Sequence, residues 1–505
     1  MNKCHRRDFW VQINNLPAFI AVWPGDILNA SSVELVTAIL AVFVKRIQYL
    51  LLSAVVESYL SRGVVSNKFV ISRFTYRFGL YNRLETDYQS SNLVSSSAVN
   101  HMNISDLILK RLTPGQISAL QLLGRTSESI GVRAFLVGGT VRDLILDRAL
   151  TDLDVSVECH PQELTASGHI NTDMVEKISP FGTAKVTLSD NLIDVAMARA
   201  ESYPSPGALP EVTKARIEDD LARRDFTINA LASSITPSTW GEILDLHGGL
   251  EDIDSSCLRV LHNESFSDDP TRIFRAARYL SRLEFDFDAN TYDLIAEAHD
   301  GIINLTGTRI ANELEKIFLE SNPLNVLQIL ETWDVLADIQ SDLSVDNHLK
   351  ELMLRGGYPS DERKLMGFLL LALPLLCTGR RELCERLNLA TAISSPIGDL
   401  DRIDGLSEGM KPSQIHARLT SCHDAALEAA CDYYGGWVRD QIVLYQTKLR
   451  EITLDISGAD VLAMGLKEGP EIGRVIETIK SSLIDGEISS KEEQIKLAQS
   501  LLTPC

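Results

Sequence analysis

Two aspartates placed two residues apart, Asp152 and Asp154, have the clearest capacity for chemistry in this sequence. They lie in "TDLDVSVE", where strict alternation places Asp152, Asp154 and Ser156 on one face of a predicted strand and apolar side chains on the other. Two carboxylates side by side repel each other, and a divalent ion would remove that cost. Hard oxygen ligands suit Mg²⁺, and pairs of such ions drive phosphoryl and nucleotidyl transfer. For this D-x-D pattern alone, an exposed edge strand with solvated aspartates is the simpler interpretation.

A double glycine precedes the aspartates in "FLVGGTVRDLI". The apolar run 134–137 predicts a buried strand, and the spacing of the residues after Gly139 predicts a helix. Glycines between a strand and a helix N-terminus leave backbone N–H groups open to an anion, and Arg142 in the first helical turn could reach the same anion. The pattern is neither a P-loop nor a dinucleotide fingerprint, and a plain tight turn is the alternative. Because the double glycine and Arg142 come shortly before Asp152 and Asp154, this pattern favours a metal site at the two aspartates over an exposed edge strand.

A third stretch, "DLARRDFTINALA", places two arginines and an aspartate together at 223–225. We expect a helix here that buries Leu221, Phe226, Ala230 and Leu231. For Arg223, Arg224 and Asp225 in isolation, a surface salt-bridge cluster is a fair interpretation.

The stretch "DDPTRIFRAARYLSR" predicts a helix with Pro270 at its first position and Asp269 as N-cap. One face is apolar (Ile273, Ala276, Ala277, Leu280) and another is basic (Arg272, Arg275, Arg278, Arg282). The arginines have no acidic partner among themselves at i±4, so an anion such as a triphosphate or an RNA backbone is a natural partner. A solvated basic face, or pairing with acids elsewhere in the chain, is the alternative.

Asp269 and Arg272 are close enough to meet one nucleobase, since residues three apart on a helix are neighbours. Cytosine and adenine each present an amine donor beside a ring-nitrogen acceptor. A carboxylate can accept from the amine while a guanidinium donates to the ring nitrogen, and uracil and guanine reverse that pattern. Asp194 in "NLIDVAMAR" is a candidate third carboxylate on a neighbouring strand, with a surface aspartate at a strand end as the alternative.

Together these motifs resemble the class II CCA-adding tRNA nucleotidyltransferases and bacterial poly(A) polymerases, within the polymerase-β-like nucleotidyltransferase superfamily. The resemblance also includes "ILDLHGGLEDI" and extends over about residues 102–320, with the motifs in the same order. It implies Asp152 and Asp154 as catalytic Mg²⁺ ligands. It also implies nucleotide binding by Gly139, Arg142, Arg224, Asp269, Arg272, Arg275 and Arg278. Within that set Asp269 and Arg272 form the protein template that selects CTP and then ATP, and Asp225 holds the ribose side of the pocket.

One position departs from the family pattern. The family more often has Glu-Asp where this chain has Asp268 and Asp269, which puts the local geometry in question but leaves the template pair intact. "PFGTAKV" (180–186) resembles the corresponding strand of the CCA-adding members more than the basic version in poly(A) polymerases.

The implied fold class is α+β, with a small polymerase-β-like nucleotidyltransferase head followed by an all-helical neck, body and tail. We place the head at 102–245, a helical neck with the nucleotide-selecting helix at 246–325, and a tRNA-binding body and tail at 326–505. Residues 1–101 form an extra segment of uncertain status, since 84–101 has a linker-like composition and a well-patterned helix begins at Met102.

Composition sets further bounds. The net charge of −21 is uneven: residues 1–101 carry ten Lys and Arg against six Asp and Glu. The apolar runs at 35–44 and 47–56 are each ten residues long, against the roughly 20 that span a bilayer, so we expect no membrane partner. Eight scattered cysteines without a C-x-x-C pair favour a reducing compartment, the cytoplasm by default.

The function predicted from the sequence is addition of C, C and A to the 3′ end of tRNA from CTP and ATP, without a nucleic-acid template. A poly(A) polymerase shares the catalytic motifs but often has a strongly basic terminus, whereas this C-terminal region is acidic ("LIDGEISSKEEQ"). A CC-only or A-only enzyme is a further alternative, because the motifs barely differ. A non-catalytic RNA-binding relative is the alternative from another class, disfavoured by the intact aspartates and template pair.

Overall fold

The computed structural model describes residues 102–502, except 151, 166–167, 172–173, 177, 180–181, 203–210 and 347–361. The chain divides between residues 98 and 99 into two units, and all described residues lie in the second. The expectations for residues 1–101 therefore lie outside the described residues.

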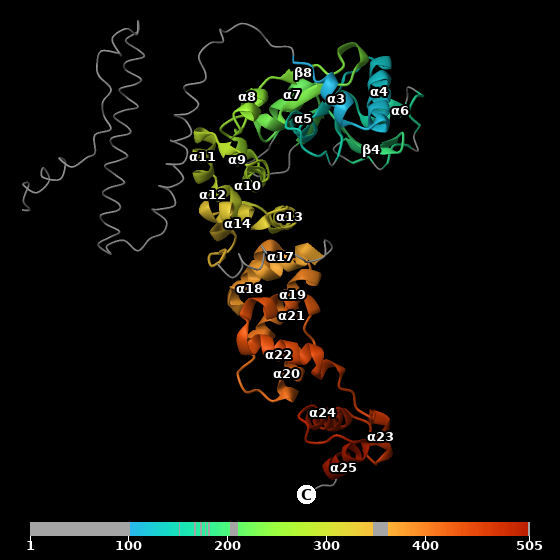
Figure 1. Ribbon diagram of the computed structural model, residues 1–505, viewed down its shortest axis with the longest axis vertical. Helices are drawn as coiled ribbons and strands as arrows, with labels where there is room; N and C mark the ends of the chain where they lie inside the picture. Colours follow the sequence, from blue (N-terminus) through green and yellow to red (C-terminus); the bar gives the residue numbers. More distant parts are fainter. Residues whose placement is uncertain are drawn as a thin grey trace, which may run out of the picture. The chain divides into compact units, whose positions relative to one another are not determined.

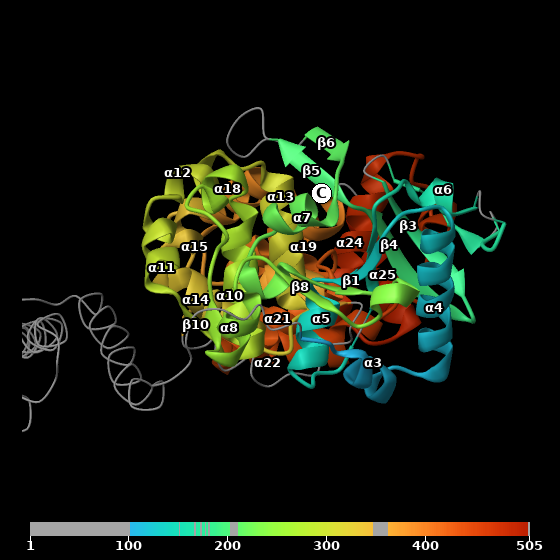
Figure 2. The same cartoon turned by 90° about the horizontal axis from the view of Figure 1, so that it is seen from above.

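A six-stranded mixed sheet forms the centre of the first part of the described chain (Figures 1 and 2). Its strand order is β3-β4-β2-β1-β7-β8, in which β2 and β4 are parallel and every other neighbouring pair is antiparallel. The strands are β1 (Ala134–Val137), β2 (Asp154–Val157), β3 (Thr183–Leu188), β4 (Asn191–Met197), β7 (Leu231–Ser234) and β8 (Ile243–Asp245). The strands predicted at 134–137 and around Asp194 are both confirmed.

Helices cover both faces of this sheet. Leu120 and Leu123 of α4 (Pro114–Ser129) pack in one core with Leu136 of β1 and Val155 of β2. Alternate side chains of the same sheet pack in a second core against α7 (Ile217–Ala222). Because β1 and β7 are enclosed on both sides, all their residues are buried, whereas the edge strand β3 alternates between exposed and buried.

The prediction of one helix over "DLARRDFTINALA" is wrong for the residues after Ala222. The helix α7 ends at Ala222, Phe226 is extended and bridges to Val260, and a 3₁₀ turn at Thr227–Asn229 leads into β7. The Asp225 carboxylate accepts hydrogen bonds from the Phe226 N–H and the Asn229 side chain, which stabilises a turn in place of a continuing helix. The four side chains expected to be buried are buried, because the turn and strand enclose them as a helix would have.

The predicted "DDPTRIFRAARYLSR" helix is confirmed as α10 (Thr271–Leu283), with its apolar face buried. It follows a short helix α9 (Ser265–Asp268) and packs against α13 (Gly307–Phe318) and α14 (Pro323–Thr332). The helix begins one residue later than expected, but Asp269 still performs the capping role, since its Oδ1 accepts from the Thr271 N–H at 3.0 Å.

Beyond β10 (Asp286–Phe287), every described element is helical, as the sequence predicts (Figure 1). The helices α17 (Arg363–Ala372), α18 (Cys377–Leu387), α19 (Thr391–Asp404), α20 (Pro412–Leu419), α21 (Asp424–Tyr434) and α22 (Gly436–Thr447) contribute to the large core. The last three helices, α23 (Gly458–Ala463), α24 (Pro470–Ile484) and α25 (Lys491–Leu502), share a small core of their own. No helix in the described part of the chain has the length and apolarity needed to cross a membrane.

Candidate active site

The turn at Gly138 and Gly139 joins β1 to α5 (Gly139–Ile145) and packs directly against Arg224. Gly138 has a φ of +63°, a conformation that side chains with a Cβ rarely adopt. A Cβ at this position would also lie 2.5 Å from Nη1 of Arg224. The glycine therefore allows the guanidinium to lie against the backbone at the start of the helix.

Asp152 and Asp154 follow α5 in the chain and are tied to its first turn. The Thr140 hydroxyl accepts from the N–H of Asp154 at 3.0 Å and donates to the carbonyl of Asp152 at 3.4 Å. Both aspartate side chains remain exposed at the start of β2. Thr140 thus holds the backbone of both aspartates in place, and these hydrogen bonds do not use the carboxylate oxygens.

Asp194 on β4 is the direct partner of Asp154 in the parallel register of β2 and β4. Although its side chain reaches the surface, the protein around the Asp154 carboxyl displaces part of its water, and this desolvation and the neighbouring Asp194 charge raise its pKa. Lys185 on β3 lies across from Asp194, with Nζ 3.1 Å from a carboxylate oxygen. The strand arrangement therefore brings the candidate third carboxylate beside the predicted pair.

The three aspartates offer oxygen ligands suited to Mg²⁺. Among the residues that the structure describes, no three acidic, His or Cys side chains lie together so that they could hold a metal ion. The pair Asp152 and Asp154 is the smaller ligand set, and magnesium is commonly held by one or two carboxylates plus substrate phosphates. Asp152 and Asp154 would hold such an ion, with Asp194 beside them.

Asp225 is the buried centre of the Arg-Arg-Asp segment. Its Oδ2 accepts from Nε and Nη2 of Arg275 at 2.8 and 2.5 Å, and its Oδ1 accepts from Asn229 at 3.0 Å. Burial alone would raise the pKa of this carboxyl, but the Arg275 charge and these hydrogen bonds outweigh it and lower the pKa to about 2. Asp225 is therefore a permanently charged link between the head and α10.

Two neighbouring arginines are positioned by the same segment. Asn229 accepts from Nη1 of Arg142 at 2.5 Å, and Asp143 holds the other side of that buried guanidinium. Arg224 donates to Asp220 at 2.9 Å and to the Asn229 carbonyl at 3.3 Å. Asn229 therefore connects both arginines with Asp225.

Hydrogen bonds from other protein groups position both members of the predicted template pair, Asp269 and Arg272. Arg272 is buried and donates to the Ser265 hydroxyl at 2.7 Å and to the Arg223 carbonyl at 2.8 Å. Asp269 accepts through Oδ1 from Thr271 and, at 2.7 Å, from Arg309 of α13. Its hydrogen bonds with other described residues all fall on Oδ1, so with respect to that part of the chain Oδ2 is left to accept from a ligand.

The basic face of α10 is paired with acids from other elements, as the alternative interpretation held. Arg278 and Arg282 both contact Glu320, Arg278 also lies 3.5 Å from Glu313, and Arg275 pairs with Asp225. Arg278, predicted to bind nucleotide, does not line the central cavity described below. These arginines are positioned by protein carboxylates whether or not an anion binds.

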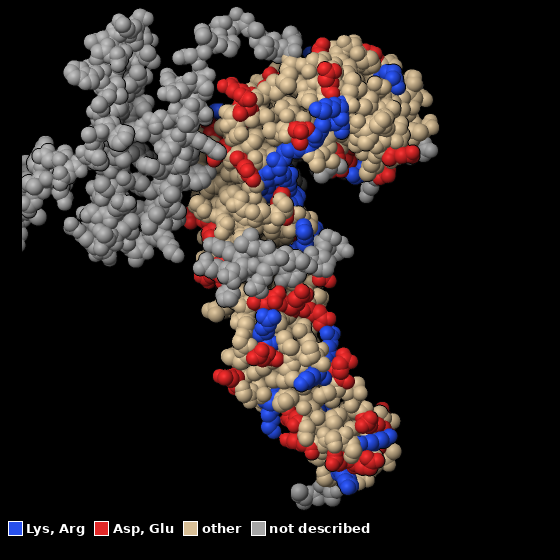
Figure 3. Space-filling view, in the orientation of Figure 1, with Lys and Arg blue, Asp and Glu red and all other residues tan. Residues whose placement is uncertain are grey.

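One cavity of about 670 Å³, here called the nucleotide cavity, collects the other predicted residues. It is bordered by Gly139, Arg142, Asp152, Asp154, Arg224, Asp269, Arg272 and Arg275. Its volume lies within the roughly 300–1,000 Å³ common for ligand sites. Lys and Arg side chains gather over the region around α5 and α10 (Figure 3), and the cavity border carries eight Lys and Arg side chains beside seven Asp and Glu side chains.

The nucleotide cavity also contains residues that sequence reasoning missed. They include Thr140, Asn229 and Tyr279, together with Arg309, Glu313 and Lys316 of α13. The α13 residues follow an i, i+4, i+7 spacing, and this polar stripe on an otherwise amphipathic helix could have indicated a site. Asn229 carries no such pattern, because its role depends on partners distant in the sequence.

Comparison with known proteins places this geometry in a family. Residues 134–259 match the family model "Poly A polymerase head domain", and residues 284–345 match "Probable RNA and SrmB- binding site of polymerase A". The A-adding tRNA nucleotidyltransferase of Geobacter sulfurreducens is 30% identical over 443 residues, which are 82% of this chain and 49% of the relative. The A-adding enzyme of Halalkalibacterium halodurans is 28% identical over 79% of this chain and 95% of its own length. The chain thus spans about half of the first relative and nearly all of the second.

Solved structures agree with the sequence relatives. An apo CCA-adding enzyme superposes with a TM-score of 0.66 at 27% identity, covering 79% of this chain and 99% of the other. The Thermotoga maritima CCA-adding enzyme complexed with tRNA superposes with a TM-score of 0.60 at 26% identity, covering 80% and 99%. The fold and the cavity define a protein with a polymerase-β-like nucleotidyltransferase head. The chain is thus similar to the tRNA nucleotidyltransferases over most of its length, and its head matches the poly(A) polymerase head domain.

The Asp225–Arg275 pair yields a prediction about stability. Asp225→Asn should lower the free energy of unfolding by roughly 1–3 kcal/mol at pH 7, because it removes the charged partner of Arg275, whose side chain is 36% exposed so that water replaces part of the lost interaction. A carboxyl with a depressed pKa stabilises the fold above its unfolded pKa, and that contribution is lost as pH falls toward the folded pKa of about 2. The difference from the unmodified protein should therefore be full above about pH 4 and narrow toward pH 2. Urea unfolding at several pH values measures it, with the exposed Asp190→Asn as control. A difference that stays constant down to pH 2 would contradict the assignment.

Proposed function

We propose that this chain is a tRNA nucleotidyltransferase that adds C, C and A to the 3′ end of tRNA, using CTP and ATP without a nucleic-acid template. The observation that carries the proposal is the nucleotide cavity, which is bordered by two carboxylates, several fixed arginines and a base-sized donor–acceptor pair. The relatives named as tRNA nucleotidyltransferases, and solved CCA-adding enzymes with tRNA, ATP and CTP, support the same chemistry.

In this mechanism Asp152 and Asp154 hold divalent ions, for which Mg²⁺ is our proposal, with Asp194 as the third carboxylate. Magnesium bound there would activate the 3′-hydroxyl and balance the charge of the departing pyrophosphate. Arg142 and Arg224 lie beside the glycine turn, and their protein partners hold them in place before the nucleotide arrives. Donors fixed in advance are the ones that stabilise developing charge most effectively.

Base selection falls to Asp269 and Arg272. The free Oδ2 of Asp269 accepts from the exocyclic amine of cytosine or adenine, and Arg272 donates to the ring nitrogen next to it. The Nε–H of Arg272 takes part in none of its bonds to Ser265 or Arg223, which leaves a donor for the base. A base with a carbonyl in place of the amine would leave two acceptors facing each other.

A second candidate is an enzyme that adds only the terminal A. It is favoured by the names of three relatives at 28–30% identity, from Geobacter, Halalkalibacterium and Aquifex, all described as A-adding. A CC-adding relative from Deinococcus is 28% identical, so this product also stays an alternative.

The described cysteines are free thiols, which supports our proposal of a reducing, cytoplasmic location.

One assay distinguishes these products. The protein is incubated with Mg²⁺ and a tRNA that ends either before CCA or after CC, with CTP, ATP or both, and the 3′ ends are sequenced. We expect complete CCA on the first tRNA and a single A on the second. Addition to the second tRNA alone would identify an A-only enzyme, and two C residues that ATP does not extend would identify a CC-only enzyme. A long A tail would identify a poly(A) polymerase, and unchanged ends on both tRNAs would refute the nucleotidyltransferase proposal.

Asp152→Ala tests the metal assignment. This variant should lose at least about a thousandfold of the transfer rate, because removing a ligand disrupts the ion-binding carboxylate pair. Binding of tRNA, measured by fluorescence anisotropy, should be unchanged. Asp254→Ala, an exposed aspartate at the end of α8 (Gly249–Asp254), is the matched control and should keep full activity. Retained transfer in the Asp152 variant would overturn the assignment.

Asp269→Asn tests the template assignment. Its amide can donate where the carboxylate accepts, so incorporation of U relative to C should rise by roughly five- to a hundredfold while transfer continues. The adjacent Asp268→Asn is the control, because Asp268 does not line the nucleotide cavity and lies near His262. Single-turnover incorporation with each of the four nucleotides measures the ratio, and unchanged selectivity in the Asp269 variant would refute the template role.

A further inference from the structure

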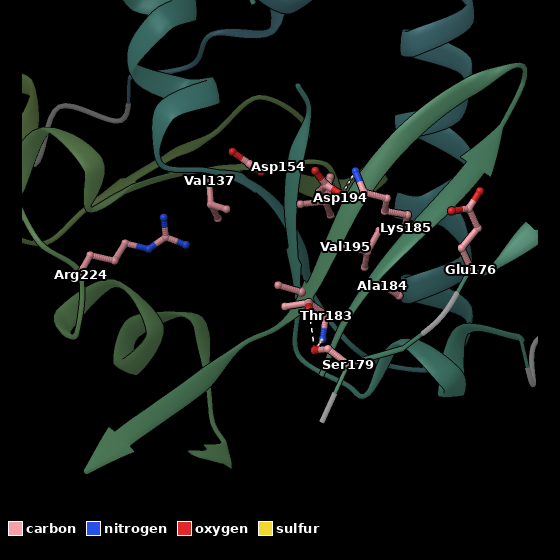
Figure 4. A pocket seen from close by; sticks show the side chains of 12 residues that line it. Val137, Asp154, Glu176, Ser179, Thr183, Ala184, Lys185, Asp194, Val195 and Arg224 are labelled. Atoms are coloured by element: carbon pink, nitrogen blue, oxygen red, sulfur yellow. Dashed lines mark hydrogen bonds and ion pairs between the residues drawn. The ribbon is translucent and has the colours of Figure 1, made fainter. Parts of the chain in front are cut away.

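Tyr279 of α10 is the only aromatic residue among the described residues that border the nucleotide cavity. Other residues of this border have a role in the proposed mechanism, as do Asp154 and Arg224, which Figure 4 shows from close by. Tyr279 has no role in it, although it follows Arg272 and Arg275 at the i, i+3, i+7 spacing that places three residues on one helix face. The same face of α10 therefore presents two arginines and an aromatic ring to one cavity.

The ring of Tyr279 lies against the guanidinium groups of two arginines from different parts of the fold. Its centroid is 5.2 Å from Cζ of Arg142, which belongs to α5, and 5.7 Å from Cζ of Arg275, one turn earlier in α10. Both distances lie within the roughly 6 Å over which a cation is attracted to the face of an aromatic ring. The Tyr279 hydroxyl also accepts a hydrogen bond from Nη2 of Arg275 at 3.3 Å. Tyr279 thus contacts the sheet domain through Arg142 and its own helix through Arg275.

The orientation of the Tyr279 ring is fixed by Phe226, which is fully buried. The two rings meet edge to face, with centroids 5.7 Å apart and planes at 83°, an arrangement that aromatic pairs prefer. Because Phe226 lies in the turn that carries Asp225, its contact holds the Tyr279 ring against the sheet domain whether or not a ligand binds. A ring held in this way can orient the guanidinium groups that lie against it.

Arg142 keeps donors for a ligand although protein groups surround it. It is 2% exposed, and Asp143 accepts from its Nε and Nη2 while Asn229 accepts from its Nη1. These bonds use three of the five N–H donors of the guanidinium, so two remain for a ligand. Hydrogen bonds hold the edge of the group, and the ring of Tyr279 attracts the whole cation. The two kinds of contact together determine where the remaining donors lie.

We propose that Tyr279 is a positioning residue for nucleotide binding. Its ring sets the position of the Arg142 guanidinium, so that the two remaining N–H donors meet the triphosphate, and it does so from the helix that carries Arg272. One face of α10 then holds the groups that bind the base and the phosphates at a fixed spacing. This inference rests on the proposed function and adds to it a residue that acts on the nucleotide through Arg142.

The test compares Tyr279→Leu with Tyr279→Phe in the full-length protein, by isothermal titration calorimetry with Mg²⁺. The dissociation constants of ATP and of pyrophosphate should both rise about three- to tenfold in Tyr279→Leu, the loss of one cation–π contact. The dissociation constant of adenosine, which has no phosphate, should stay unchanged. Tyr279→Phe keeps the ring and should stay within about twofold of the unmodified protein for all three ligands.

Tyr292→Leu is the matched control. Tyr292 of α11 (Ala289–Ala296) is also a partly buried tyrosine in edge contact with a phenylalanine, Phe287 at 6.4 Å, and it does not border the nucleotide cavity. It should leave the three dissociation constants unchanged. Thermal unfolding shows whether each variant is folded, and Tyr279→Met, which is also apolar and lacks an aromatic face, replaces Tyr279→Leu if that variant does not fold.

A double-mutant cycle with Arg142→Gln tests whether Tyr279 acts through Arg142. Arg142→Gln alone should weaken the binding of ATP. Addition of Tyr279→Leu should then weaken it little further, because the contact between the ring and the guanidinium is already lost. Additive losses would mean that Tyr279 acts on the nucleotide without Arg142 and would overturn the proposal.

The possible outcomes separate this inference from the proposed function. If the unmodified protein transfers no nucleotide to tRNA, the proposed function fails, and the titrations with ATP and pyrophosphate still test Tyr279. If it transfers nucleotides but Tyr279→Leu binds ATP as Tyr292→Leu does, only the role of Tyr279 fails. A loss in Tyr279→Phe as large as in Tyr279→Leu would assign the effect to the hydroxyl and would likewise overturn the role of the ring.

Discussion

The ion pair between the buried Asp225 and the partly exposed Arg275 is the interaction on which the candidate site depends. It joins the turn after α7, which belongs to the sheet domain, to α10, which carries Arg272. Burying the Asp225 charge is costly, and the cost is offset because Asp225 accepts from Arg275, from the Phe226 N–H and from Asn229. Together with the hydrogen bond from Arg272 to the Arg223 carbonyl, this pair holds the predicted catalytic carboxylates and the predicted base-selecting pair in one arrangement.

Asn229 connects this ion pair to Arg142, on the side of the nucleotide cavity where we propose that the triphosphate binds. Its amide nitrogen donates to Asp225 while its amide oxygen accepts from Arg142, so one side chain orients an acid and a base at once. Arg224 lies next to it, donates to the Asn229 backbone and packs on Gly138. The arginines thus have fixed positions before any ligand binds, because acidic neighbours hold them there.

Local patterns were sufficient to predict much of this structure. The apolar face of α10 and the strand around Asp194 each depend on residues within one element, and both are confirmed. The strand around Asp154 is confirmed over Asp154–Val157, but Asp152 precedes it and Ser156 is buried because β2 lies between β1 and β4. The helix through 221–231 was wrong because its ending depends on a side-chain bond from Asp225 to the following backbone, which periodicity does not encode. The same limit applies to Arg278: helix spacing showed a basic face, while its acidic partners lie 35 and 42 residues further along the chain.

The pair that we propose for base selection, Asp269 and Arg272, matches a pattern of donors and acceptors that is common to cytosine and adenine. It excludes uracil and guanine but does not by itself rank a pyrimidine against a purine, since the two differ in ring size and not in this edge. The relatives differ in product, since they are described as A-adding, CC-adding and CCA-adding. On our proposal the donor–acceptor pair therefore limits the choice to C and A, and the choice between the two must depend on the space around the base, because a purine is larger than a pyrimidine. In the nucleotide cavity that space is bordered by side chains from the sheet domain and from α13, which differ from those of the pair itself.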